Sequence, residues 1–371
     1  MSLTRAEKMK IVDIIAGARP NFMKIAPIIR EIDGRLETSG RFIYRLVHTG
    51  QHYSSSMSGD FFTQLGIPIP TVNLEAGSGS QAEQTAAIMV RYEKLLLDRP
   101  SHLCLVVGDV TSSMACAITA QKLNIPVAHV EAGIRSGDWS MPEEINRLVT
   151  DAITNYFFTT SEDAGRNLLR AGVSSDKIYF VGNTMIDTLL SNISKLRAPE
   201  FWSHQKLSNG EYFVLTLHRP TNVDLADSVS QILYAISDAT RGLPVIFPVH
   251  PRTEKSMRMM RNIPKNIHVV PPQPYLEFNY LVANSKAVIT DSGGITEEAT
   301  VLGIPCLTLR NTTERPETVT IGTNVLLGTD PQAIRPALDI LFAGKWKSGG
   351  IPELWDGNTA KRIVTILETL L

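Results

Sequence analysis

Residues 101–147 read SHLCLVVGDVTSSMACAITAQKLNIPVAHVEAGIRSGDWSMPEEINR, and this stretch indicates the fold of the whole chain. Two apolar runs within it, Leu103–Val107 and Pro126–Val130, are rich in Val and Leu and too short to be helices. Such runs are typical of buried parallel strands, and the residues between them predict a crossover helix. The stretch therefore predicts a strand–helix–strand unit of an α/β fold.

Each of the two predicted strands is followed by a carboxylate, Asp109 after the first and Glu131 after the second. Ligands of open α/β sheets bind outside the carboxyl ends of the strands, so we expect both acids at one site. The residues that follow add two arginines and an acid near a predicted helix start: Arg135, Glu143 and Arg147. Acids at such positions often only cap helices or form structural ion pairs. Their convergence with arginines at one sheet edge instead favours an anionic substrate that undergoes proton transfer.

Composition limits the classes of protein to which the chain can belong. Its 371 residues exceed what one core usually holds, so two domains are expected. A net charge of −1 gives no basic field, and nucleic acid is not expected as a partner. The cysteines, Cys104, Cys116 and Cys306, lie in apolar segments without metal-ligand spacing and are expected to be reduced. No apolar stretch reaches the length of a membrane span, so we expect a cytoplasmic protein without membrane partners.

The amino-terminal end of the chain predicts a first strand over Lys10–Ala16 that leads directly into a helix. Gly17 would allow the tight turn between them, and Arg19 and Lys24 lie near the predicted helix start. Backbone N–H groups at a helix amino terminus favour an anion, so this pattern suggests a phosphate or carboxylate site. The alternative is that both cations are solvated on an amphipathic helix.

Residues 77–82, GSGSQA, match the dinucleotide-binding pattern G-x-G-x-x-A. The strand predicted before them, TVNL, is short, and the glycines follow the third strand of the series rather than the first. A single match of this kind is frequently accidental, and a nicotinamide site here is the minor alternative.

A second series of alternating strands and helices follows Leu196–Gly210, a stretch that loses periodicity and is predicted to be a linker. Polar residues follow several strands of this series, among them His218, His250 and the segment DSGG at 291–294. A Ser-Gly-Gly turn that leads into a helix lets backbone N–H groups approach a diphosphate closely. The alternative is that Asp291 and Ser292 only cap that helix.

The sequence blocks in their order resemble the non-hydrolysing UDP-N-acetylglucosamine 2-epimerase family. The resemblance covers nearly the whole chain and rests on these blocks: GARPNFMK, GDV, HVEAGIRS, PEEINR, VGNTMID, LHRPTN, PVHPR, TDSGGITEEA and TTERPET. It implies a GT-B-like α/β fold, with two doubly wound Rossmann-like domains facing across a cleft. The first domain would comprise residues 1–185 and contain the catalytic acids, completed by the helix at 357–371. The second, residues 186–356, would bind UDP.

By the same resemblance the activity is the C2 epimerisation of a UDP-2-acetamido sugar, UDP-N-acetylglucosamine to UDP-N-acetylmannosamine. The family eliminates UDP to give a 2-acetamidoglucal and adds it back, needs neither cofactor nor metal, and is commonly dimeric. The resemblance and the motifs together give four catalytic candidates: Asp109, Glu131, Glu143 and His218. They also give substrate-binding candidates: Arg19, Lys24, Arg135, Arg147, Gln273, Phe278, Ser292, Gly293, Gly294, Glu298 and Arg315. Which carboxylate acts on which face of the sugar stays open.

The chain departs from the commonest bacterial pattern in two places. Ser54 stands near a position where some bacterial members have a second glutamine for a regulatory substrate molecule, although Gln51 is present. LHRPTN lacks the second arginine and the glutamate that are found after the histidine in many members. Both variants are similar to a branch that includes enzymes acting on a diacetamido uronic acid, so that substrate is an alternative. A GT-B glycosyltransferase and a catalytically silent sugar-nucleotide sensor are the other two.

Overall fold

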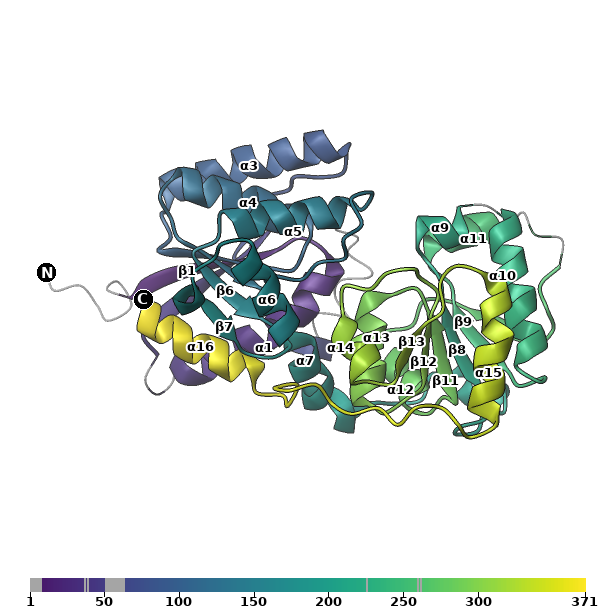
Figure 1. Cartoon of the computed structure of the whole chain (residues 1–371). Helices are drawn as coiled ribbons and strands as arrows, with labels where there is room; N and C mark the ends of the chain where they lie inside the picture. Colours follow the sequence, from purple (N-terminus) through teal and green to yellow (C-terminus); the bar gives the residue numbers. More distant parts are fainter. Residues whose placement is uncertain are drawn as a thin grey trace, which may run out of the picture. The chain divides into compact units, whose positions relative to one another are not determined.

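The computed structural model describes residues 9–36, 38, 40–50, 64–224, 226–258, 260 and 262–371. The chain divides into two compact units, Met1–Ser191 with Glu353–Leu371, and Asn192–Pro352. Each unit contains one parallel sheet with flanking helices, which confirms the predicted α/β class (Figure 1). No helix in the described part of the chain is both long enough and apolar enough to cross a membrane.

The sheet of the first unit has the strand order β3-β2-β1-β4-β5-β6-β7. Its strands are β1 (Lys10–Ala16), β2 (Phe42–His48), β3 (Val72–Asn73), β4 (Leu103–Val107), β5 (Val127–Val130), β6 (Tyr156–Thr159) and β7 (Ile178–Phe180). The strand–helix–strand unit predicted from residues 101–147 is confirmed, since α4 (Thr111–Lys122) connects β4 to the parallel β5. The strand order reverses between β1 and β4, which is where ligands of open α/β sheets bind.

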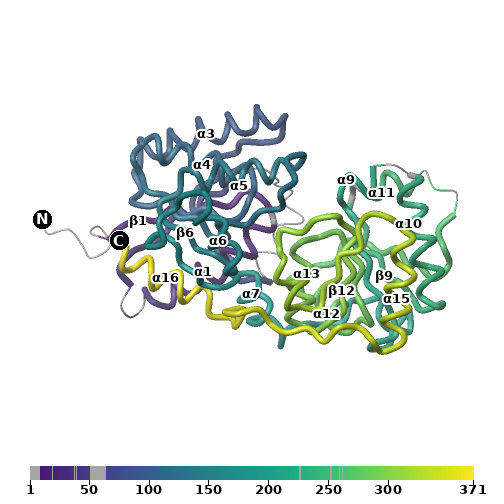
Figure 2. Tube along the Cα trace, in the orientation of Figure 1, coloured from purple at the N-terminus to yellow at the C-terminus, as the bar shows by residue number. Residues whose placement is uncertain are grey.

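Helices cover both faces of this sheet (Figures 1 and 2). They are α1 (Arg19–Leu36), α3 (Gln81–Asp98), α4, α5 (Pro142–Ala152), α6 (Glu162–Arg170), α7 (Thr184–Asn192) and α16 (Thr359–Leu370). Cys104 and Val106 of β4 belong to a core shared with Ile88 and Tyr92 of α3. The last helix, α16, packs beside α1 on the other face, and an ion pair of 2.6 Å joins Arg35 to Glu368.

The sheet of the second unit has the strand order β10-β9-β8-β11-β12-β13. Its strands are β8 (Phe213–Thr216), β9 (Val245–Pro248), β10 (Ile267–Val270), β11 (Ala287–Thr290), β12 (Cys306–Thr308) and β13 (Asn324–Leu326). Its helices are α8 (Phe201–His204), α9 (Pro220–Val223), α10 (Ala226–Ala239), α11 (Pro251–Met257), α12 (Tyr275–Ala283), α13 (Gly293–Val301), α14 (Pro316–Thr320) and α15 (Ile334–Phe342).

Alternate residues of β8 enter two different cores. Phe213 and Leu215 pack with residues of α10 and α15, whereas Val214 packs with residues of α12 and α13. This follows from the strand period of two, which sends successive side chains to opposite faces of a sheet. Because both faces are covered, the strand sequences are almost continuously apolar, as buried parallel strands require.

The stretch Leu196–Gly210 differs from the predicted linker, because it belongs to the second unit and contains the short helix α8. Trp202 packs edge-on against Tyr212 and Tyr280, with ring centroids 5.4 and 5.1 Å apart. A search for periodicity misses such a segment, because a single large aromatic residue anchors it instead of a repeating apolar pattern.

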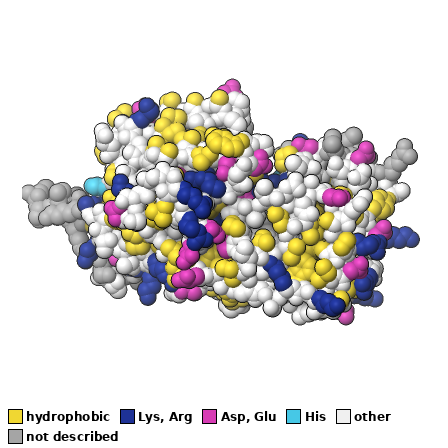
Figure 3. All heavy atoms as spheres, viewed as in Figure 1, with side chains coloured by type: hydrophobic (Ala, Val, Ile, Leu, Met, Phe, Trp, Pro, Cys, Tyr) yellow, Lys and Arg dark blue, Asp and Glu magenta, His cyan; other side chains and the backbone are white. Residues whose placement is uncertain are grey.

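Acidic and basic side chains are interspersed on the face of the molecule seen in Figure 3. This distribution agrees with the net charge of −1.

Candidate active site

The structure brings Asp109 and Glu131 to neighbouring strand ends in the first unit. Val107 is in register with Val130, and the Gly108 N–H donates to the Val130 carbonyl at 2.9 Å. Asp109 and Glu131 are the residues that follow these paired positions at the carboxyl edge of the sheet. This is the arrangement that the two strand-end carboxylates predicted.

Glu131 is paired with Lys24 of α1 across the sheet edge. The Lys24 Nζ lies 2.7 Å from Glu131 Oε2, and the side chains are only 13% and 3% exposed. Gly108 has a φ of +66°, and a Cβ there would lie 3.0 Å from Lys24 Nζ. Glycine at this position therefore both permits the turn and leaves room for the ion pair.

Glu131 itself has a φ of +70°, in the left-handed region that favours glycine. The N–H groups of Glu131 and Ala132 both donate to the Phe158 carbonyl, at 3.0 and 3.1 Å, and hold this turn in place. A buried non-glycine residue in this conformation costs about 1–3 kcal/mol, and such residues are concentrated at functional sites. The backbone outlier therefore supports a functional reading of Glu131 independently of its charge.

Asp109 is held by a buried arginine that it shares with a second acid. Arg147 lies 2.5 Å from Asp109 Oδ2 and 2.7 Å from Glu144 Oε2. Glu144 also accepts from the N–H groups of Ser136 and Gly137, at 2.9 and 3.1 Å. Burial alone would raise the pKa of Glu144, but these hydrogen bonds outweigh it and hold the pKa below its usual value.

Glu144, which the sequence reasoning did not select, takes the inward position next to the predicted Glu143. Glu143 is half-buried at the first turn of α5 and has no hydrogen bond or ion pair with a described residue. The helical period could have found the difference, because Glu144, Arg147 and Asp151 lie at i, i+3 and i+7 on one face.

A second buried network lies behind these acids and includes the predicted Arg135. Asp151 accepts from Arg135 at 2.6 Å, from the Gly133 N–H at 3.0 Å and from His129 Nδ1 at 2.8 Å. The other ring nitrogen of His129 lies 3.0 Å from the Gly108 carbonyl. Although burial acts to raise it, the pKa of Asp151 is lowered by His129 and Arg135. This network joins the turn before Asp109 to the loop after Glu131, and sequence reasoning missed both His129 and Asp151.

The turn before α1 is tied to the same sheet edge. Asn21 accepts from the N–H groups of Gly17 and Ala18, at 3.2 and 3.0 Å, and donates to the Val107 carbonyl at 2.8 Å. A Cβ at position 17 would lie 1.9 Å from Ser112 Oγ, so only glycine fits there. Arg19 begins α1, but its side chain is outside the described part of the structure, as are the side chain of Arg252 and all of Gln51 and Ser54.

The glycines of GSGSQA lead into a capped helix. Ser80 is the N-cap of α3, its side chain accepts from the Glu83 N–H, and Glu83 in turn accepts from the Ser80 N–H. This capping box gives the motif a structural role at the start of α3.

In the second unit, His218 and Asp291 meet at the carboxyl ends of the adjacent strands β8 and β11. His218 Nδ1 lies 2.8 Å from Asp291 Oδ1. The same carboxylate accepts from the N–H groups of His218 and Arg219, at 3.0 and 2.9 Å, and from Asn222 Nδ2 at 3.1 Å. Asp291 is completely buried. Burial acts to raise its pKa, but the hydrogen bond and charge of His218, with the other donors, lower it.

Ser292, Gly293 and Gly294 form the amino-terminal turn of α13. Ser292 is the N-cap by position, but its side chain makes no capping hydrogen bond, and Asp291 is used by His218 instead. The capping alternative is therefore not realised by these side chains. A Cβ on Gly293 would lie 3.9 Å from both Arg310 Nη1 and Glu314 Oε2, which places a buried ion pair of 2.6 Å beside this turn.

The other predicted residues of the second unit lie on α12, on α13 and in the adjoining loops. Glu298 accepts from the Tyr275 hydroxyl at 2.9 Å and from Asn279 at 3.4 Å. Burial raises the pKa of Glu298 to about 7, although these two hydrogen bonds act to lower it. The remaining three residues have local partners: Arg315 pairs with Glu297 at 2.5 Å, Gln273 donates to the Pro271 carbonyl at 2.7 Å, and Phe278 packs against the core below α12.

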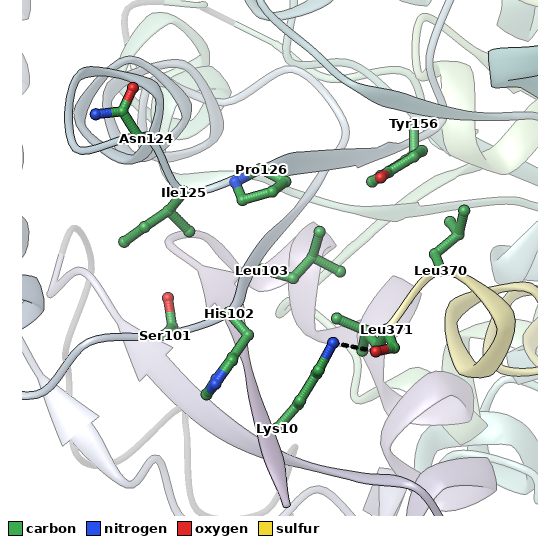
Figure 4. A pocket seen from close by; sticks show the side chains of 10 residues that line it. All are labelled: Lys10, Ser101, His102, Leu103, Asn124, Ile125, Pro126, Tyr156, Leu370 and Leu371. Carbon is green, nitrogen blue, oxygen red and sulfur yellow. Dashed lines mark hydrogen bonds between the residues drawn. The ribbon is translucent and has the colours of Figure 1, made fainter.

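A pocket of about 280 Å³ lies at the opposite, amino-terminal edge of the first sheet (Figure 4). It is lined by Lys10, Ser101, His102, Leu103, Asn124, Ile125, Pro126, Tyr156, Leu370 and Leu371. None of the predicted site residues is among them, and Lys10 Nζ donates to the Leu371 carbonyl oxygen. In the described part of the chain, no three His, Cys, Asp or Glu side chains are grouped so that they could hold a metal ion.

Comparison with known proteins relates this geometry to a family. Residues 34–368 match the family model described as UDP-N-acetylglucosamine 2-epimerase. The UDP-N-acetylglucosamine 2-epimerase of Methanocaldococcus jannaschii is 40% identical over 368 residues, which are 96% of this chain and 98% of the relative. The UDP-2,3-diacetamido-2,3-dideoxy-D-glucuronate 2-epimerase of Pseudomonas aeruginosa is 38% identical over 324 residues, 86% of this chain and 88% of the relative.

A solved structure gives the same result. The Methanocaldococcus jannaschii UDP-GlcNAc 2-epimerase, crystallised with UDP-GlcNAc and UDP, has a TM-score of 0.85 at 40% identity. The match covers 97% of this chain and 100% of that one. The sequence and the fold agree, and the chain belongs to the UDP-N-acetylglucosamine 2-epimerase family.

Proposed function

We propose that this protein is an isomerase that interconverts UDP-N-acetylglucosamine and UDP-N-acetylmannosamine. The C1–O bond breaks and its electron pair leaves with UDP, the C2 proton passes to a protein base, and a C1–C2 double bond forms. UDP and a proton then add back to this 2-acetamidoglucal, with the proton delivered to the other face of C2. The relatives support this reaction, since those of Methanocaldococcus jannaschii are named for it and crystallised with UDP-GlcNAc and UDP.

The observation that carries this proposal is the pair of acids at adjacent strand ends, each held by its own cation. Asp109 is paired with Arg147, and Glu131 with Lys24. The C2 proton is not next to a carbonyl group, so its direct removal would be very slow. Elimination and re-addition need one base and one proton donor, one for each face of the sugar. Asp109 and Glu131 are the proposed pair, with Glu143 as a further candidate.

The second unit is proposed to hold the nucleotide and to stabilise the leaving diphosphate. Protonated His218, together with the backbone N–H groups of residues 292–294, would meet the negative charge that develops as the C1–O bond breaks. Glu298 is proposed to accept from the ribose hydroxyls, while Gln273 and Phe278 contact the uracil. The cations Arg19, Arg135 and Arg315 complete the proposed substrate contacts.

A second substrate has a specific observation in its favour. The Pseudomonas aeruginosa relative, named for a UDP-2,3-diacetamido uronic acid, is 38% identical to this chain. A GT-B glycosyltransferase is less well supported, because sugar transfer needs at most one base and the chain has two paired acids.

Proton NMR in deuterium oxide, with UDP-N-acetylglucosamine and without NAD or added metal, tests the proposal. We expect loss of the C2 proton signal together with growth of the UDP-N-acetylmannosamine anomeric signal. Exchange only with the diacetamido uronic acid nucleotide would move the substrate to that class. Silence with both compounds would contradict the epimerase proposal and favour the transferase or the sensor.

We further propose a cytoplasmic homodimer that supplies polysaccharide biosynthesis. The family resemblance supports this, and light scattering after size-exclusion chromatography measures the oligomeric state. A monomeric mass at the working concentration of the enzyme would contradict the dimer.

A further inference from the structure

We propose that Asp291 is the positioning residue of His218: its carboxylate fixes the tautomer of the imidazole and directs Nε2 toward the diphosphate subsite at Ser292–Gly294. This inference rests on the proposed function, because the diphosphate subsite is part of it. It adds a residue for which the sequence suggested only the role of a helix cap.

Asp291 holds His218 at two points, one on the main chain and one on the ring. The Asp291 carboxylate accepts from the backbone N–H of His218, at 3.1 Å for Oδ1 and 3.0 Å for Oδ2, so the main chain is held. It also lies 2.8 Å from Nδ1 of the same residue, which holds the ring. An ionised carboxylate can only accept, so the hydrogen at this contact is on Nδ1. Nε2 is then the ring nitrogen available to a ligand.

The burial of the two partners differs in the way that this role requires. Asp291 is completely buried, whereas the His218 side chain is 37% exposed. No described residue forms a hydrogen bond with His218 Nε2. Because its donors keep the pKa of Asp291 below its usual value, the acceptor is ionised at neutral pH. Its buried negative charge can neutralise a doubly protonated imidazole, whose Nε2–H would donate to a diphosphate oxygen.

The other charged groups near His218 do not replace Asp291. The ring centroids of His250 and His218 are 6.0 Å apart, and an imidazole cannot supply the negative charge of a carboxylate. Arg219, the next residue, lies 3.4 Å from Glu314, and its own N–H donates to Asp291. Asp291 is therefore the carboxylate that hydrogen-bonds to the ring in the described structure.

The position of Asp291 in the chain links the ring to the diphosphate loop. Asp291 directly precedes Ser292, the N-cap residue of α13, whose N–H donates to Thr290 Oγ1 at 2.9 Å. The residue that holds the imidazole at the end of β8 is therefore joined directly, through the main chain, to the start of the amide turn. We infer that the imidazole and the amide turn keep a constant relation because Asp291 hydrogen-bonds to the first and directly precedes the second in the chain.

Nitrogen NMR of histidine in the full-length protein tests the tautomer directly. The His218 signals are identified among those of the eight histidines by their absence in His218→Ala. In the unmodified protein we expect the Nδ1-protonated neutral form at high pH. A ring protonated only on Nε2 would overturn the inference, and this measurement needs neither turnover nor an altered Asp291.

Asp291→Asn is the matched variant, since it keeps the shape and the oxygen acceptor but places an amide donor at the ring. We expect His218 to change to the Nε2-protonated tautomer. Because the neutral amide cannot neutralise a doubly protonated imidazole that faces the leaving diphosphate, we expect a loss in kcat on the order of 10²-fold or more. KM and the Kd for UDP should change less than about threefold, because the binding groups remain in place.

Two outcomes of this variant would refute the role. An unchanged tautomer with a lost kcat would show that Asp291 acts otherwise than through the ring, and an equal loss in kcat and UDP affinity would show a general structural defect. Asp291→Asn made in the His218→Ala background should cause no further loss in kcat, and an additive loss would contradict the inference. The NMR and UDP titrations stay informative even if the proposed sugar substrate is wrong, so the two failures can be told apart.

Discussion

The two units each contain a histidine paired with a buried aspartate at the same Nδ1–oxygen distance of 2.8 Å, His129–Asp151 in the first and His218–Asp291 in the second. The second ring nitrogen distinguishes them. In His129 it lies 3.0 Å from the Gly108 carbonyl, and the side chain is 1% exposed. In His218 the side chain is 37% exposed. The same pair of side chains thus joins two loops in one unit and includes a partly exposed imidazole in the other.

The difference follows from what surrounds each carboxylate. Asp151 also holds Arg135 and the Gly133 N–H, so it fixes the backbone on which Glu131 stands. Asp291 holds the N–H groups of His218 and Arg219, so it fixes the histidine itself. A hydrogen-bonded Asp–His pair therefore indicates a catalytic group only where the other ring nitrogen is accessible.

The largest effect is expected for Asp109 in the first unit. Its substitution should lower turnover without weakening the UDP binding that we propose for the second unit. Asp109→Asn should lower turnover by about 10⁴-fold or more, because the amide cannot take a proton, and leave the Kd for UDP within about threefold. Solvent exchange at C2 measures the first quantity and calorimetry the second. The control is Asp98→Asn, in which the changed side chain is 77% exposed. A loss of UDP affinity as large as the loss of turnover would show that Asp109 has been assigned the wrong role.

The second prediction concerns the His218–Asp291 pair, in which the histidine is partly exposed. His218→Ala should reduce kcat by about 10²- to 10³-fold, because a charged donor to the leaving diphosphate is removed. The melting temperature should fall by less than about 4 °C, since a partly exposed ring supports little of the core. His204→Ala at the exposed end of α8 is the control in the same unit. Unchanged turnover would remove His218 from the mechanism.

For the His129–Asp151 pair, in which both ring nitrogens have protein partners, we expect a change in stability. Asp151→Asn leaves His129 and Arg135 without their buried counter-ion, so we expect a loss of about 3–5 kcal/mol in the free energy of unfolding, measured with urea. Because the pKa of Asp151 is lowered in the fold, its contribution is present above the unfolded value and is lost as pH falls through the folded one. The variant should therefore lose less stability than the unmodified protein between about pH 5 and pH 2.

Asp163→Asn is the control for that experiment, because Asp163 forms an exposed ion pair with Arg166 and should matter by less than about 1 kcal/mol. If Asp151→Asn is as stable as this control, the two Asp–His pairs do not differ as described.

The smallest effect concerns a buried carboxylate without a cation. Among the described residues Glu298 accepts hydrogen bonds only from neutral donors, Tyr275 and Asn279, and burial raises its pKa to about 7. A raised pKa means that the folded state binds the proton more tightly, so stability falls as pH rises from about 4.5 to 7. Glu298→Gln should remove this slope and be more stable at pH 8 by on the order of 2 kcal/mol.

Thermal unfolding across that pH range measures the slope, with Glu254→Gln on the exposed face of α11 as the control. A slope that persists in Glu298→Gln would assign the pH dependence to another group.

Much of the site could be read from local patterns. Short apolar runs predicted β4 and β5, and the polar residues directly after them placed Asp109 and Glu131 at the sheet edge. The residues that pair with these acids were harder to predict from the sequence. Glu143 was selected where Glu144 makes the contacts, because the choice between two adjacent acids depends on which side of α5 faces Arg147.

The sequence by itself determined the α/β class, the strands and the turns that follow them, because strand period, apolar runs and glycine turns are local properties of the chain. Only the tertiary structure decided which charges meet. Lys24 and Glu131 pair although they are 107 positions apart in the sequence, and the His218 N–H donates to Asp291, which is 73 positions away in the sequence. Such pairs depend on the order of strands in each sheet, here β1-β4-β5 and β8-β11, and no local pattern specifies that order. Contacts between distant residues also explain why His129 is buried with both ring nitrogens partnered while His218 is partly exposed.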